Sequence, residues 1–103
     1  MAENRKYNGW ANYETWNVAL WMGESGDFYA EIAGDIFRQT KGNEYLSQLE
    51  QATSDFADSL KTEHEENMPE VTGCYSDLLG AALSEVDWYE IAEHYQEFME
   101  EEK

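Results

Sequence analysis

The chain has 103 residues with 23 acidic and six basic side chains, which gives a net charge of −17 at pH 7. Small soluble domains usually carry a net charge of about 2–8 in magnitude, and a surface this negative repels nucleic acid and anionic lipid. The charge therefore argues against direct binding of either and predicts a basic partner.

Length and hydrophobic content predict one soluble domain. The sequence is 42% hydrophobic, which is enough to form one core without metals or disulfides. Cys74 is the only cysteine, as expected in a reducing compartment. The sequence has neither an apolar run near the roughly 20 residues of a membrane span nor a signal-peptide core. We expect a cytoplasmic protein, with residues 1–8 as a flexible arm and residues 100–103 frayed.

Apolar residues recur at a helical spacing from residue 12 onward, which predicts an all-α bundle of four to five helices. The first helix should cover residues 12–22, with Asn12 as N-cap and an inward face of Tyr13, Trp16, Leu20 and Trp21. Asp27 should cap the second helix, whose core-facing stripe is Phe28, Ile32, Ala33, Ile36 and Phe37.

Three further helices are expected in the second part of the chain. A long one should cover residues 44–66, with Leu46, Leu49, Ala52, Thr53, Phe56 and Leu60 inward. A short one should follow the turn residues Pro69 and Gly73. Asp87 and Glu90 have the spacing of a capping box and should open a fifth helix that continues to Met99. We see no Asn-Gly hairpin between alternating apolar runs.

No motif for catalysis, cofactor binding or metal binding stands out. His64 and His94 lie on different predicted helices, without the second histidine that a zinc-protease helix needs. Calcium-loop and phosphate-loop patterns are also absent from the sequence. Cys74 lacks a recognisable protease context and is expected to be buried or half-buried. The sequence therefore predicts a protein that is not an enzyme and needs no cofactor or metal.

Acidic side chains concentrate on the third and fifth predicted helices. Between Asn43 and Glu102 the only basic side chain is Lys61, whereas solvated helix faces usually alternate in sign. A solvated charged face is the ordinary interpretation, and a partner-binding face is the alternative that this absence of cations favours. The candidate partner-binding acids are Glu50, Asp55, Asp58, Glu90, Glu93, Glu97, Glu100 and Glu101.

Aromatic residues form a second candidate surface near the N-terminus. Tyr13, Trp16 and Trp21 have helical spacing, which favours the core. Trp10 precedes the helix and is the better candidate for an exposed partner-binding anchor, or for a staple over the helix start.

Residues 8–21 (NGWANYETWNVALW) resemble the opening signature of a family of small acidic proteins found in bacteriophages, plasmids and bacterial genomes. Residues 77–88 and 91–94 are similar to the C-terminal half of that family. The family has no established activity, so the resemblance implies no catalytic residue. It implies a mobile-element setting in a bacterial host, where small acidic proteins often block restriction or CRISPR machinery by imitating DNA.

The expectation that follows is an acidic, DNA-mimic-type inhibitor that occupies the basic cleft of a host nucleic-acid-binding protein. B-DNA carries one phosphate charge per about 1.7 Å of axis, so the charge of this chain is on the scale of a short duplex segment. Two alternatives remain: an interaction module or homodimer that uses the N-terminal aromatics, and an enzyme that uses paired carboxylates.

Overall fold

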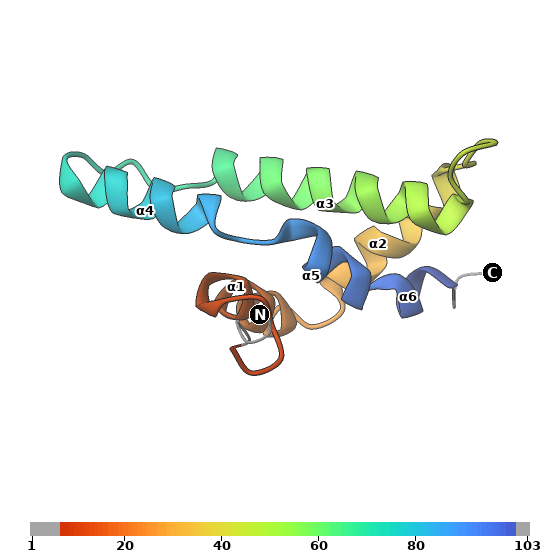
Figure 1. Cartoon of the computed structure of the whole chain (residues 1–103), viewed down its shortest axis with the longest axis horizontal. Helices are drawn as coiled ribbons and strands as arrows, with labels where there is room; N and C mark the ends of the chain where they lie inside the picture. The colour runs from red at the N-terminus through yellow and green to blue at the C-terminus, as the bar shows by residue number, and fades with distance from the viewer. Residues whose placement is uncertain (1–6, 101–103) are drawn as a thin grey trace.

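Six helices occupy residues 7–100, the part of the chain that the computed structural model describes (Figure 1). In that part, the only bridge between extended residues pairs Tyr7 with Trp10, so the predicted all-α class is confirmed. The helices number one more than the upper limit predicted. They are α1 (Tyr13–Gly23), α2 (Phe28–Gln39), α3 (Gln48–Glu66), α4 (Cys74–Ser84), α5 (Trp88–His94) and α6 (Gln96–Glu100).

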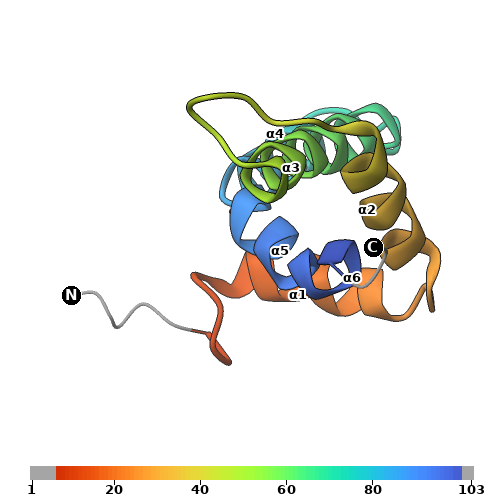
Figure 2. The same ribbon diagram turned by 90° about the vertical axis from the view of Figure 1, so that its right-hand side faces the viewer.

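The core lies between α2, α3, α5 and α6, which surround it when the molecule is viewed along its long axis (Figure 2). Helix α3 supplies Phe56 and Leu60, as the sequence predicts, and α5 supplies Ile91. Met99 of α6 and Met22 at the end of α1 complete the set of large, fully buried apolar side chains. The buried part of the molecule is thus centred on one side of α3.

Helix α1 begins where predicted but turns the other face to the core. Asn12 is the N-cap and accepts a hydrogen bond from the Thr15 N–H at 2.9 Å. The expected inward face was wrong: Tyr13 is 48% exposed and Trp21 is 66% exposed. Thr15 and Met22 are buried instead. Because α1 is apolar on nearly every side, its periodicity does not distinguish the two faces.

Helix α3 begins four residues later than predicted. The Asn43 side chain accepts hydrogen bonds from the N–H groups of Tyr45 and Leu46, which holds that segment in a turn. Leu46 is therefore exposed rather than inward. Ser47 and Glu50 then form a complete capping box, and the helix starts at Gln48.

The predicted fifth helix is interrupted at Tyr95, which separates α5 from α6. The Tyr95 N–H bonds to the Ala92 carbonyl, three residues back, so the α-helical pattern tightens and ends there. The Tyr95 ring packs between the aromatic rings of Phe56 and Phe98. This packing fixes the position of the break.

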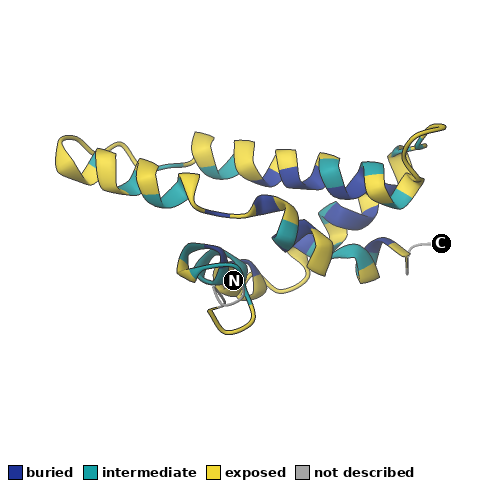
Figure 3. Ribbon diagram, viewed as in Figure 1, coloured by how far each residue is buried: buried dark blue, intermediate teal, exposed yellow. Residues whose placement is uncertain are grey.

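Helix α4 forms where predicted but projects beyond the core. Figure 1 shows it extending past the end of α3, and Figure 3 shows only exposed and intermediate residues along it. None of its residues, Cys74–Ser84, is buried, and the predicted burial of Cys74 was wrong. The Cα radius of gyration is 14.8 Å, compared with about 13 Å for a compact domain of this length. A helix held off the core accounts for the difference.

Candidate interaction surfaces

A strip of acidic side chains lines one face of α3. Asp55, Asp58 and Glu66 border a shallow hollow of about 500 Å³ together with Glu63 and polar residues. Asp55, Asp58 and Glu66 are exposed, whereas Glu63, seven residues after the buried Phe56, is half-buried and accepts a hydrogen bond from the Tyr29 hydroxyl. No Lys or Arg among the described residues lines this hollow. Lys61, three residues after Asp58 on α3, is exposed but does not line the hollow, so the strip is a patch of negative charge with one basic residue beside it.

Two of the predicted partner-binding acids have structural roles instead. Glu50 accepts a hydrogen bond from the Ser47 N–H at 3.0 Å, which closes the capping box of α3. Glu90 is half-buried and accepts a hydrogen bond from the Ala11 N–H, also at 3.0 Å. The sequence signal for Glu50 was present, since Ser47 precedes it by three residues. The distant partner of Glu90 gave no such signal.

The acids of α5 and α6 do not continue the strip on α3. Glu93, Glu97 and Glu100 are exposed, but the break at Tyr95 places them on two short helices. Glu101 lies outside the described residues. The α3 strip faces away from the side of α3 that packs on α5. The two predicted acidic faces are therefore separate surfaces.

Trp10 is not an exposed anchor in this structure. Its ring is half-buried and stacks on the His94 ring, with the centroids 4.1 Å apart. Asn8 and Gly9 have positive φ angles and form a tight turn that pairs Tyr7 with Trp10. Tyr7 and Asn8, which we assigned to the flexible arm, thus belong to an ordered turn; residues 1–6 lie outside the described part.

The N-terminal signature residues join the start of α1 to the start of α5. The Thr15 hydroxyl, fully buried, accepts a hydrogen bond from the Asp87 N–H at 2.8 Å. The Asn12 side-chain amide donates to the Glu85 carbonyl at 2.7 Å. Together with the bond from Ala11 to Glu90, these contacts attach the first helix to the chain leading into α5. The polar part of the signature therefore has a structural explanation.

An apolar surface around α4 is the feature that sequence reasoning missed. Tyr75 is 70% exposed and Leu78 is 64% exposed. A groove of about 220 Å³ runs between α1 and α4, lined by Tyr13, Glu14, Asn17, Val18, Leu79, Ala82, Leu83 and Val86. The sequence predicts a short helix here but does not indicate which of its apolar residues stay exposed. Sequence periodicity identifies an apolar face without showing what covers it.

Two tyrosines have altered acidity. Burial raises the pKa of Tyr29, and the nearby Glu63 carboxylate, which accepts a hydrogen bond from its hydroxyl at 3.5 Å, raises it further. Burial alone raises the pKa of Tyr95. Both shifts favour the neutral phenol, so these groups act as packed side chains rather than as bases near neutral pH.

The histidines and carboxylates form no metal centre within residues 7–100, where no group of three potential ligands comes together. His64 is bound to the Leu60 carbonyl through Nδ1, at 2.8 Å, and His94 stacks on Trp10. In the same range, no helix has the length and apolar character needed to cross a membrane. Besides the acidic strip and the apolar groove, the described residues form a hollow of about 440 Å³ between α3 and α4, lined in part by Lys61, Leu83 and Trp88.

The family model described as "Family of unknown function (DUF7249)" matches residues 3–103. The match includes the N-terminal signature, the α3 strip and the α1–α4 groove. No curated protein matches the chain, and no solved structure does.

Proposed function

The chain belongs to the DUF7249 family, and we propose that it is an acidic inhibitor that occupies the nucleic-acid-binding cleft of a basic partner protein. In this proposal the chain comes from a mobile element, the partner is a restriction or CRISPR protein of the bacterial host, and both are cytoplasmic. The inhibitor competes with nucleic acid for the cleft and performs no chemistry.

The observation that supports this function best is the acidic strip on α3. Four of the seven side chains lining the hollow are carboxylates, namely those of Asp55, Asp58, Glu63 and Glu66. Like charges three or four residues apart destabilise a helix by roughly 0.2–0.5 kcal/mol per pair. A strip that lowers helix stability in this way is explained if a basic partner neutralises it.

The dimensions of the strip match a short piece of nucleic acid. From Asp55 to Glu66 the helix rises about 16 Å at 1.5 Å per residue. One strand of B-DNA carries about five phosphates over that length, at one per 3.4 Å. The α3 hollow offers four carboxylates over the same distance. Three of these carboxylates, those of Asp55, Asp58 and Glu66, are exposed and would stand in for phosphates, whereas Glu63 is half-buried and accepts a hydrogen bond from the Tyr29 hydroxyl.

The exposed acids of α5 and α6, Glu93, Glu97 and Glu100, form a secondary surface in this proposal. They belong to the same −17 chain and add to the long-range field that attracts a basic protein. Glu50 and Glu90 are removed from the binding set because each caps a backbone N–H. Trp10 is removed because its ring packs on His94.

The test compares two variants that lose the same charge. One carries Asp55→Asn, Asp58→Asn and Glu66→Gln on the strip; the control carries Glu14→Gln, Glu24→Gln and Glu31→Gln, which lie on or next to α1 and α2. Each protein is added to restriction endonucleases and CRISPR nucleases of bacterial origin, and cleavage of a DNA substrate is measured at several salt concentrations.

We expect the wild type and the control variant to inhibit at least one of these nucleases, and the strip variant to inhibit it at least about tenfold less, a change of 1.4 kcal/mol. Inhibition should weaken as salt rises, because screening is strong beyond about 10 Å at 0.1 M. Equal inhibition by the strip variant and the control would show that α3 is not the binding face. Absence of inhibition across the nucleases would count against the proposed partner class.

A further inference from the structure

We propose that the groove between α1 and α4 binds a basic amphipathic helix of a partner protein. Its apolar side would pack on α4, and its cationic side chains would pair with carboxylates around the groove. The groove shares no lining residue with the α3 strip, and the inference does not depend on the proposed inhibition of nucleases.

The first line of evidence is the packing of α4 itself. None of its residues is buried, although its sequence is mainly apolar. Tyr75, Leu78 and Ala82 recur at intervals of three and four residues and form one open side of the helix. This is the spacing with which one helix presents a ridge to another. Helix α4 therefore offers a docking face that the described part of the chain leaves uncovered.

The groove has the shape to receive side chains of another helix. Leu79, Ala82 and Leu83 of α4 face Tyr13 and Val18 of α1 across it. Its volume is about 220 Å³, which is smaller than the roughly 300–1,000 Å³ of typical small-molecule pockets. A second hollow of about 300 Å³ on the other side of Leu79 and Leu83 contains Tyr29 and His64. Leu79 and Leu83 thus form an apolar ridge between two hollows.

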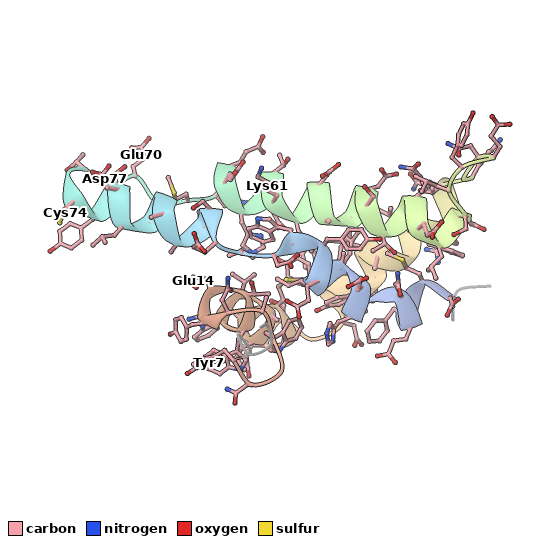
Figure 4. All side chains as sticks on the ribbon, in the orientation of Figure 1. Tyr7, Glu14, Lys61, Glu70, Cys74 and Asp77 are labelled. Atoms are coloured by element: carbon pink, nitrogen blue, oxygen red, sulfur yellow. The ribbon has the colours of Figure 1, made fainter. Side chains whose placement is uncertain are left out.

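The charges around α4 select a basic occupant. Glu14 lines the α1–α4 groove, and Glu63 lines the neighbouring hollow. Figure 4 shows Glu14 on α1, below α4, and shows Glu70 and Asp77 near the outer end of α4 on the side away from α1. No Lys or Arg of residues 7–100 lines either hollow; Lys61 and Glu65 line a third hollow, of about 440 Å³, which also borders Leu83. A mainly apolar groove that contains the carboxylate of Glu14, on a chain of net charge −17, complements a helix with Leu-type residues on one side and Lys or Arg on the other.

The same charges disfavour a second copy of this chain as the occupant. Two copies would each bring a net charge of −17 to the contact, and net charge of this size keeps proteins apart. No Lys or Arg among residues 7–100 lines the groove, so the groove of a second copy would bring no cation to pair with Glu14. A cationic partner removes this repulsion.

The probe is a synthetic peptide of Leu and Lys, about 18 residues or five helical turns long, with Leu at helical spacing on one side. A scrambled peptide of the same composition has the same charge but no apolar stripe. Binding of each labelled peptide to the full chain is measured by fluorescence anisotropy. The test variant is Tyr75→Ser with Leu78→Ser; the matched control is Tyr45→Ser, since Tyr45 is 83% exposed in the loop before α3.

We expect the wild type to bind the amphipathic peptide at least about tenfold more tightly than the scrambled one, as burial of one large apolar side chain predicts. The double variant should lose this preference, and Tyr45→Ser should retain it. Asp55→Asn with Asp58→Asn should weaken both peptides equally, which separates this site from the α3 strip. Circular dichroism confirms that each variant is folded.

Equal affinity of the wild type for both peptides would overturn the proposal, as would an unchanged preference in the double variant. Sedimentation of the wild type alone supplies the remaining comparison. If the wild type is a dimer that Leu78→Ser converts to a monomer, the open side of α4 binds a second copy and the proposed basic helix is rejected.

Discussion

Glu90 and Ala11 are 79 positions apart, yet the Glu90 carboxylate accepts a hydrogen bond from the Ala11 N–H at 3.0 Å. Near it, the Asp87 N–H donates to the Thr15 hydroxyl at 2.8 Å. Each helix start thus supplies an acceptor for a backbone N–H at or next to the start of the other. The sequence predicts a capping box within residues 87–90, and half of it forms, because the Asp87 side chain accepts from the Glu90 N–H. The reciprocal bond of a capping box would join the Asp87 N–H to the Glu90 side chain. Here the Asp87 N–H donates to Thr15 instead, and the Glu90 side chain accepts from Ala11.

Replacing Thr15 by Val should destabilise the fold by about 1–3 kcal/mol, because the Asp87 N–H would lose its acceptor and point at the methyl group of a fully buried side chain. The two side chains have nearly the same shape, so the change tests the hydroxyl. Urea unfolding measures the loss. Thr62→Val on the exposed side of α3 is the control and should change stability by less than about 0.5 kcal/mol. Equal effects at the two positions would show that the Thr15 hydrogen bond contributes little.

Replacement by Ala should lower the stability of the fold at Glu90 but not at Glu93. Glu90→Ala removes the acceptor of the Ala11 N–H and should cost about 0.5–1.5 kcal/mol. Glu93 is exposed between other acids, so Glu93→Ala should be neutral or stabilising by a few tenths of a kcal/mol. Thermal unfolding of the two variants at the same salt concentration compares them. If the Glu90→Ala protein were more stable than the wild type, the hydrogen bond between Glu90 and Ala11 would not stabilise the fold, and Glu90 would behave as a solvated acid.

Replacement by Ala should lower the stability of the fold at Gly42 and raise it at Gly23. Gly42 has a φ of +74°, and an added Cβ would lie 2.7 Å from the Gln48 backbone nitrogen and 2.8 Å from the Leu46 carbonyl oxygen. Gly42→Ala should destabilise the protein by more than about 1 kcal/mol. Gly23 is helical and its Cβ position is open, so Gly23→Ala should stabilise by roughly 0.4–1 kcal/mol. Calorimetry of both variants tests the backbone geometry at the start of α3.

Stability should fall above about pH 10, and Tyr95→Phe should reduce the fall. The pKa of Tyr95 is raised above its ordinary value of 10.0 in the folded protein. Above pH 10 the unfolded chain loses the phenol proton while the folded chain retains it, so deprotonation favours unfolding. The stabilisation that the neutral Tyr95 phenol gives the folded protein is complete below pH 10. It is lost as the pH rises through the pKa of Tyr95 in the folded protein. Urea unfolding at pH 8 and at higher pH measures it, with the exposed Tyr75→Phe as control.

Added sodium chloride should raise the melting temperature, because salt screens repulsion among the carboxylates of this −17 chain. A gain of about 1 kcal/mol corresponds to roughly 4–8 °C for a domain of this size. The variant with Asp55→Asn, Asp58→Asn and Glu66→Gln should start at a higher melting temperature and gain less from salt. A melting temperature that falls with salt would indicate that the acids are paired in the folded protein.

The helical class and the position of most helix starts could be predicted from the sequence alone. Asn12 and Asp87 cap helices through hydrogen bonds to residues three positions away, and such contacts depend only on local sequence. The start of α3 was missed although its signal is local, because Ser47 and Glu50 were not recognised as a capping box. The acidity of α3 was likewise apparent in the sequence, and the structure places Asp55 and Asp58 in one hollow.

The tertiary structure decided which face of each helix is used. Thr15 and Glu90 have partners 72 and 79 positions away, so no local pattern indicates that α1 buries Thr15 and exposes Trp21, or that Glu90 is unavailable to a partner. Tyr75 and Leu78 show the same limit: their spacing predicts an apolar face, and only the packed chain shows that it remains open. Periodicity describes the chemistry of a helix side, whereas burial depends on contacts between distant segments.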